Sequence, residues 1–91
     1  MLKFRNCRLT AYDVAAIGKV LADFKWVREL DLTNCFLDNS KVKEIADGLM
    51  RAKQLEILKV GKNSGMGVGV NAIIYNLAFS PKIRHIDISD S

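Results

Sequence analysis

The sequence of 91 residues is poor in the residues that most often mark a chemical site. It contains one histidine, two cysteines and one proline. A zinc site needs about four ligands, and Cys7, Cys35 and His85 are too few to supply them. Two cysteines are also too few for a disulfide-rich secreted scaffold. We therefore expect no metal and no other cofactor.

Long apolar runs and charge runs are absent as well. The N-terminal segment MLKFRNCRLTAYDV mixes charged residues with apolar ones, unlike a signal peptide. Nowhere does the chain approach the roughly 18 apolar residues of a membrane span. We therefore expect a cytoplasmic (intracellular) protein with no membrane partner. The formal net charge is +4, but the 14 lysines and arginines are dispersed among 10 acids. A nucleic-acid partner is therefore not expected.

An internal repeat of 28 residues organises the chain. When the sequence is shifted against itself by this length, apolar residues coincide without a gap over three full units. The coinciding sets are Leu2, Leu30, Leu58 and Ile86; Phe4, Leu32, Val60 and Ile88; Val14, Val42 and Val70; Ile17, Ile45 and Ile73; and Leu21, Leu49 and Leu77. Because one unit cannot bury its own apolar face, the repeat predicts stacked units that share one continuous core.

Each unit combines a strand pattern with a helix pattern. Leu30-Asp31-Leu32 alternates apolar and polar residues with the period of a strand. From about Ser40 to Met50, apolar residues recur at spacings of three and four, as in an amphipathic helix. Strand and helix therefore alternate along the chain, which predicts an α/β fold.

The segments VRELDLTNCFL and QLEILKVGKNSG resemble the L-x-x-L-x-L-x-x-N/C-x-L pattern of leucine-rich repeats, and the unit length resembles the ribonuclease-inhibitor-like class. Such repeats occur in Ran GTPase-activating proteins and in actin-regulating proteins, and the third unit is similar to tropomodulin-like repeats. The resemblance implies a right-handed leucine-rich repeat solenoid, with a parallel β-sheet on the concave side and α-helices on the convex side.

The resemblance also implies the domain organisation. We expect a single domain, 1–91, with units at about 1–28, 29–56 and 57–84 and a terminal strand at 83–88. Terminal units of a solenoid normally need a capping element to cover their core. Two alternatives therefore stay open: the chain is a fragment that packs against the rest of a longer solenoid, or it associates end to end with other copies.

Cys7, Cys35 and Asn63 share the Asn/Cys column of the pattern. In the family, this residue lies in the turn after the strand, and its side chain points inward to satisfy backbone groups of the loop. We expect both cysteines to be buried structural thiols, since neither is accompanied by a clustered base. Their redox state stays open, because adjacent strands would bring them close enough for a disulfide.

The glycine-rich segment of the third unit has two interpretations. Gly67 to Ala72 matches the G-x-G-x-x-A of a dinucleotide-binding turn, and Asp87 lies 20 residues beyond Gly67. However, Gly67 is too far from the strand residue Val60 for a tight phosphate turn, so we do not favour this interpretation.

In the repeat, Gly65 takes the column of Leu9 and Leu37. The third loop therefore lacks an apolar anchor, and we expect it to be the least rigid of the three.

Positions on the outer, concave side of the strands break the repeat and are candidates for function. One column contains Lys3, Asp31, Lys59 and Asp87, a second contains Arg5, Thr33, Gly61 and Ser89, and a third contains Arg28, Glu56 and Arg84. Charge alternates in sign along the first and third. One interpretation is cross-strand pairs worth a few tenths of a kcal/mol each; the other, which is compatible, is a surface for a protein partner. The protein-binding residues predicted here are Lys3, Arg5, Asp31, Lys59 and Asp87.

The third helix differs from its sister helices. Its solvent-side columns contain Tyr75 and Phe79, where the earlier units have Lys19 with Asp47 and Asp23 with Arg51. An aromatic pair at i, i+4 predicts a contact surface, either for an external partner or for the rest of a longer chain. Trp26 and Phe36 also stand in otherwise polar columns, and each is either a half-buried loop anchor or a contact residue.

No nucleophile, base and orienting group recur together, so we do not predict an enzyme. The resemblance implies a non-catalytic protein–protein interaction module or scaffold. The alternative is a regulatory domain of GTPase-activating or actin-regulating type. In a GTPase-activating domain, Arg5 or Arg8 would be the arginine delivered to a nucleotide.

Overall fold

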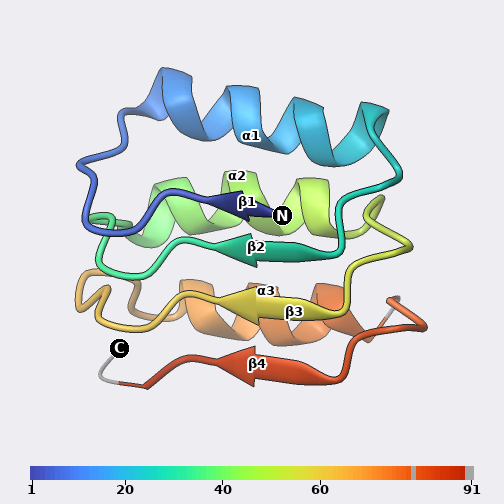
Figure 1. The fold of residues 1–91 in the computed structure, drawn as a ribbon. Helices are drawn as coiled ribbons and strands as arrows, with labels where there is room; N and C mark the ends of the chain where they lie inside the picture. The colour runs from blue at the N-terminus through green and yellow to red at the C-terminus, as the bar shows by residue number, and fades with distance from the viewer. Residues whose placement is uncertain (79, 90–91) are drawn as a thin grey trace.

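The computed structural model describes residues 1–78 and 80–89, along which four strands alternate with three helices (Figure 1). The elements are β1 (Leu2–Lys3), α1 (Ala11–Asp23), β2 (Glu29–Asp31), α2 (Asn39–Leu49), β3 (Ile57–Lys59), α3 (Gly69–Leu77) and β4 (His85–Asp87). The helix predicted from about Ser40 to Met50 is α2, which begins and ends one residue earlier.

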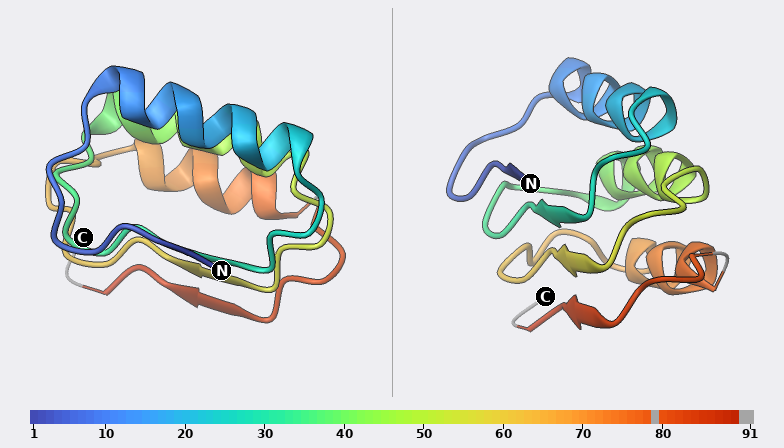
Figure 2. Two further views of the ribbon diagram at one scale, coloured as in Figure 1. Left: turned by 45° about the horizontal axis from the view of Figure 1, so that its top comes forward. Right: turned by 45° about the vertical axis from the view of Figure 1, so that its right-hand side comes forward.

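The strands form one parallel sheet in the order β1-β2-β3-β4. Leu2 pairs with Leu30, Leu30 with Leu58, and Leu58 with Ile86, so the sheet register equals the sequence repeat. All three helices lie on one face of the sheet, and Figure 2 shows them stacked in the same order as the strands. The predicted α/β solenoid, with strands on one side and helices on the other, is therefore confirmed.

The core fills the space between sheet and helices. It contains the inward residues of the central strands and the apolar stripes of α1 and α2, which are Leu30, Leu32, Leu58, Val60, Val14, Ile17, Leu21, Val42, Ile45 and Leu49. The outer strands are covered less well: Leu2 and Phe4 are partly buried, and Ile86 is 40% exposed. This gradient follows from stacking, because an inner strand has a neighbour on each side and an outer strand has one.

Local signals place the helix starts. Thr10 caps α1 in a capping box with Asp13, whose side chain accepts a hydrogen bond from the Thr10 backbone N–H. The side chain of Asp38 caps α2 through the backbone N–H of Lys41. By contrast α3 begins at Gly69 without a side-chain cap. A Cβ on Gly69 would lie 2.9 Å from Cγ1 of Val42, so glycine lets α3 pack closely against α2.

Candidate interaction surfaces

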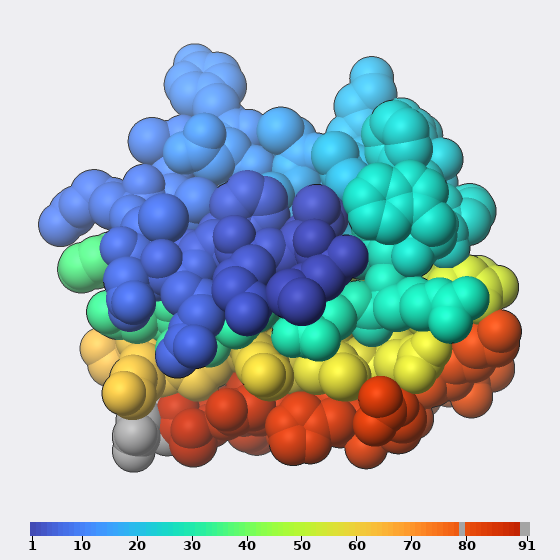
Figure 3. All heavy atoms as spheres, in the orientation of Figure 1, coloured from blue at the N-terminus to red at the C-terminus, as the bar shows by residue number. Residues whose placement is uncertain are grey.

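The strand side of the molecule carries the charged columns predicted from the sequence, and Figure 3 shows this side with the units as successive bands. The register places Lys3 beside Asp31, and Asp31 and Asp87 on either side of Lys59. Lys3 and Arg5 are exposed, whereas Lys59 and Asp87 are half-buried. Four of the five predicted residues of this face therefore reach solvent.

Asp31 is the exception, and the prediction that it faces solvent is wrong, because the residue is 0% exposed. Its Oδ1 accepts hydrogen bonds from the backbone N–H (3.0 Å) and hydroxyl (2.6 Å) of Thr33, and its Oδ2 lies 3.6 Å from Nε of Arg5. Asp31 lies in a central strand, so the neighbouring strand supplies an arginine that covers it. Asp31 can thus orient Arg5 but cannot itself contact a partner.

Asp87 repeats this arrangement on β4. Its Oδ1 accepts hydrogen bonds from the backbone N–H (3.0 Å) and the hydroxyl (2.7 Å) of Ser89. These bonds, the backbone one foremost, lower the pKa of the Asp87 carboxyl, with smaller contributions from the charges of His85 and Lys59. A Cβ on Gly61 would lie 3.0 Å from the Ser89 carbonyl oxygen and 3.3 Å from Oδ1 of Asp87. Glycine at this position therefore allows β3 to lie close to the segment after β4.

Cross-strand ion pairs occur, but not all of them follow the columns. The Arg28, Glu56 and Arg84 column forms the predicted pairs, with Glu56 3.8 Å from Arg28 and 3.1 Å from Arg84. Lys59 instead pairs diagonally with Glu29 at 3.8 Å. The diagonal pairs arise because long side chains reach neighbours two residues along the adjacent strand.

On α3, the predicted contact residues lie at the surface where the structure describes them. Tyr75 is 68% exposed and Ile74 is 51% exposed. Phe79 lies outside the described residues. Asn76, on another side of the helix, donates a hydrogen bond of 2.8 Å to the carbonyl oxygen of Ala46 and so fastens α3 to α2.

The turns after the strands contain the Asn/Cys column. The expectation that its side chains are buried and bind backbone groups is confirmed for Cys35 and Asn63. The Asn63 side chain is buried; it accepts hydrogen bonds from the backbone N–H groups of Cys35 and Leu37 and donates to three carbonyl oxygens. Cys35 is buried, and its thiol donates to the carbonyl oxygen of Phe4 at 2.6 Å. Burial raises the pKa of this thiol.

Cys7 is not buried, contrary to the prediction. The residue belongs to the first unit, at the outer edge of the stack, whereas Cys35 has units on both sides. Both thiols are free.

The premise that the third loop lacks an apolar anchor is also wrong. Met66, one residue after Gly65, is fully buried in the core. The backbone of Gly65 pairs with that of Asp38 in an isolated parallel bridge, where a Cβ would lie 3.3 Å from the Leu37 carbonyl oxygen. The anchor has therefore moved by one position, which a fixed 28-residue alignment could not show. Whether this loop is the least rigid stays a prediction.

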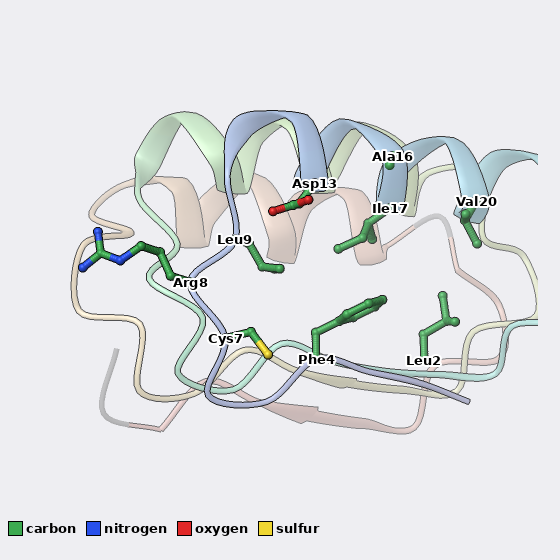
Figure 4. Close-up of a pocket in the computed structure, with 9 residues that line it drawn as sticks. All are labelled: Leu2, Phe4, Cys7, Arg8, Leu9, Asp13, Ala16, Ile17 and Val20. Carbon is green, nitrogen blue, oxygen red and sulfur yellow. The ribbon is translucent and has the colours of Figure 1, made fainter.

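Sequence reasoning did not find the groove between β1 and α1 (Figure 4). Its volume is about 400 Å³, and its floor is largely apolar, with Leu2, Phe4, Leu9, Ile17 and Val20 among the lining side chains. The equivalent residues of the second unit are buried beneath the first unit. A signal existed in the repeat, because no other unit among the described residues covers the inward side chains of the first.

The structure also shows the surroundings of Trp26 and Phe36, each of which is by its sequence either a half-buried loop anchor or a contact residue. Trp26 is 57% exposed and packs edge-to-face against Phe24, with ring centroids 6.2 Å apart. Phe36 is 52% exposed, and the Arg8 guanidinium lies 4.6 Å from its ring centroid. Arg5 and Arg8, the two arginines considered for a GTPase-activating role, thus both have partners within the chain.

Within residues 1–78 and 80–89, no three His, Cys, Asp or Glu side chains come together as ligands for a metal ion. Over the same residues, no helix combines the length and the apolar character that crossing a bilayer requires.

The stacked strand–helix units, the parallel sheet and the buried Asn/Cys turns define a leucine-rich repeat solenoid of the right-handed type. The fold is similar to that of a solved structure of leiomodin-1 actin-binding site 2, with a TM-score of 0.83 and 19% sequence identity. The similarity covers 99% of this chain and 54% of that one, so the chain spans about half the length of the leiomodin structure. No protein-family model and no curated protein sequence matches the chain.

Proposed function

We propose that the chain is a non-catalytic protein–protein interaction module. The observation that carries the proposal is that α3 has two adjacent exposed apolar side chains, whereas α1 has one large one, Tyr12. Tyr75 is 68% exposed at the column where α1 and α2 present Lys19 and Asp47, and the neighbouring Ile74 is 51% exposed. Exposed apolar side chains that are grouped on one helix are typical of a contact surface.

The concave face supplies the second part of the proposed surface. Arg5 and Lys59 are held by ion pairs with Asp31 and Glu29, and Asp87 is held by Ser89. Side chains that are ordered before binding lose less entropy when a partner arrives. We propose Lys3, Arg5, Lys59 and Asp87 as contact residues and Asp31 as the residue that positions Arg5.

Actin is the partner that we propose to test first, because the similar solved structure is named as an actin-binding site. An actin-regulating module would act inside the cell, in agreement with the cytoplasmic location expected from the sequence. The likeness in fold supports the choice of actin. The choice of contact residues is based on the exposure and charge of side chains in this chain.

Co-sedimentation with actin filaments, together with anisotropy titration of labelled actin monomers, tests the proposal. We expect the native chain to bind at least one form of actin, and Tyr75→Lys to weaken that binding about tenfold, a typical loss for an aromatic contact residue. Lys19→Glu, at the same column of α1, is the matched control and should bind as the native chain does. If the native chain binds neither form, actin is the wrong partner. If Tyr75→Lys binds normally, the α3 surface is wrong.

A further inference from the structure

A row of cations follows one edge of the solenoid, where each helix leads back into the next strand. This edge, which we call the basic rim, consists of residues 24–28, 50–56 and 80–84, and it forms the right-hand side of Figure 1. Its six basic residues are Lys25, Arg28, Arg51, Lys53, Lys82 and Arg84, all exposed. Its one acid is Glu56.

The basic rim accounts for the net charge of the whole chain. Of 14 lysines and arginines and 10 acids, the rim has six and one, which leaves eight and nine elsewhere. The rest of the molecule is therefore close to neutral, while the rim has an excess of five positive charges. Charges that are dispersed along the sequence are brought together because each of the three helix-to-strand loops contributes two of them to the same edge. Within the rim, only Lys25 with Lys53 and Arg28 with Arg84 share columns of the repeat.

Several rim cations have partners in the chain, and Arg51 pairs with Asp47 of α2, whose Oδ2 lies 3.4 Å from its Nη1. Lys25 donates one hydrogen bond, to the Arg51 carbonyl oxygen at 3.1 Å, and Lys82 donates one to the side chain of Gln54 at 2.7 Å. An ammonium group has three donors. Cations near helix C-termini also complement the helix dipoles, but that interaction fades within one turn and leaves the outward charge in place.

The basic rim already contacts one anionic group, the carboxylate of its own residue Glu56. Its carboxylate lies between two arginines, with Oε1 3.1 Å from Nε of Arg84 and Oε2 3.8 Å from Nη1 of Arg28. The rim thus already binds a carboxylate between successive units, in charge-assisted contacts of the kind that guanidinium groups favour.

Apolar side chains lie beside the cations. Phe24 is 49% exposed and Trp26 is 57% exposed, with their rings edge-to-face, and Met50 is 39% exposed. The three loops lead into neighbouring strands, which lie about 4.8 Å apart, so the row is about 10 Å long on the strand side. An extended polypeptide covers that length with about three or four residues.

We propose that the basic rim binds an acidic polypeptide segment that carries an apolar side chain. The carboxylates of the segment would lie along the row of lysines and arginines, and its apolar side chain would lie against Phe24 and Trp26. A narrow row of three loops fits a linear chain better than a flat bilayer, and the Glu56 contacts favour carboxylates. This inference rests on the proposed function as a protein-binding module and assigns it a second surface.

The test is an anisotropy titration at about 0.1 M salt with a fluorescein-labelled peptide of nine glutamates and one central tryptophan. The rim variant combines Lys25→Glu, Lys53→Glu and Lys82→Glu. The control combines Lys19→Glu, Lys43→Glu and Lys62→Glu, exposed lysines outside the rim with the same total change of charge. We expect the rim variant to bind about tenfold more weakly or worse, and the control to lose less than about threefold, because screening limits the reach of each charge to about 10 Å at 0.1 M salt. Circular dichroism verifies that both variants fold.

A variant of the peptide tests the apolar contact. Trp26→Ala should weaken binding of the tryptophan-containing peptide about threefold and leave binding of decaglutamate unchanged.

The proposal is overturned if the native chain does not bind the acidic peptide, or if the rim and control variants lose binding equally. It is also overturned if phosphatidylserine vesicles or an oligothymidylate bind the rim more tightly than the peptide does, since the occupant would then be a membrane or a nucleic acid. Actin sedimentation is a separate readout, so loss of the actin proposal with intact peptide binding leaves the rim assignment in place.

Discussion

The two edges of the solenoid come from the same repeat but differ in chemistry. Where strands lead into helices, Cys35 and Asn63 are buried and their side chains hold the backbone of adjacent turns. Where helices lead back into strands, Lys25, Lys53 and Lys82 are exposed, one on each of the three loops. The first edge stabilises the stack, whereas the second is available to a partner.

The two edges differ in how many of their backbone groups need hydrogen bonds from side chains. Asn6, Asn34 and Lys62 have φ near +60° in the strand-to-helix turns, and each donates its backbone N–H to a carbonyl oxygen of the next turn. Further along the second turn, the backbone N–H groups of Cys35 and Leu37 need side-chain acceptors. Inward polar side chains supply those hydrogen bonds. The basic rim needs fewer such contacts, so its residues are determined less by the fold.

We expect the largest change in the free energy of unfolding from a substitution at the strand-to-helix edge. Asn63→Ala removes five hydrogen bonds and leaves the backbone N–H groups of Cys35 and Leu37 without a partner in a buried place. We expect the free energy of unfolding to fall by about 3 kcal/mol or more. Urea denaturation followed by circular dichroism measures it. Asn71→Ala, at an exposed helix position, is the control and should change stability by less than about 0.5 kcal/mol. Equal effects of the two substitutions would remove the distinction between the edges.

The reactivities of the two cysteines compare an outer turn with an inner turn of the strand-to-helix edge. In the native state Cys7 should react with a thiol reagent about 100-fold faster than Cys35, because Cys35 is buried, its pKa is raised and its reaction requires local opening. Mass spectrometry of alkylated peptides over time gives both rates. In denaturant the rates should become similar; native rates that are already similar would mean that the turn after β2 is open.

A smaller effect is the pH dependence of the stability that Asp87 contributes on the concave face. The pKa of Asp87 is lowered in the folded state, so its contribution to stability is present above the unfolded pKa near 3.8 and is lost as pH falls through the folded pKa. Asp87→Asn should therefore lower the Tm by about 2 °C or less at pH 7. The two proteins should converge once the pH lies below the folded pKa of Asp87. A Tm difference that grows on acidification would contradict the assignment.

The effect on stability that we expect on the basic rim is small at each substituted position. The variant with Lys25→Glu, Lys53→Glu and Lys82→Glu should change the free energy of unfolding by less than about 0.5 kcal/mol per substitution, as exposed positions usually do. The same urea denaturation measures it. A loss comparable to that of Asn63→Ala would show that this edge, too, is required for the fold.

The fold was predictable because the repeat is redundant. Each apolar column appears three or four times, so a single mismatch such as Gly65 does not obscure the strand–helix alternation. The candidate surfaces were predictable only in part. Tyr75 is exposed as expected, but Asp31 is buried. Thr33 binds its carboxylate locally, whereas Arg5 lies beside it only once the strands pair.

The sequence by itself determined the repeat length, the order of strands and helices, and which residues form the core, because these depend on the periodicity of apolar side chains. Only the tertiary structure decided which polar residues are covered, that Met66 replaces the missing anchor, and that dispersed cations form one basic rim. Those outcomes depend on how neighbouring units stack, and one unit's pattern does not contain the position of the next unit's side chains.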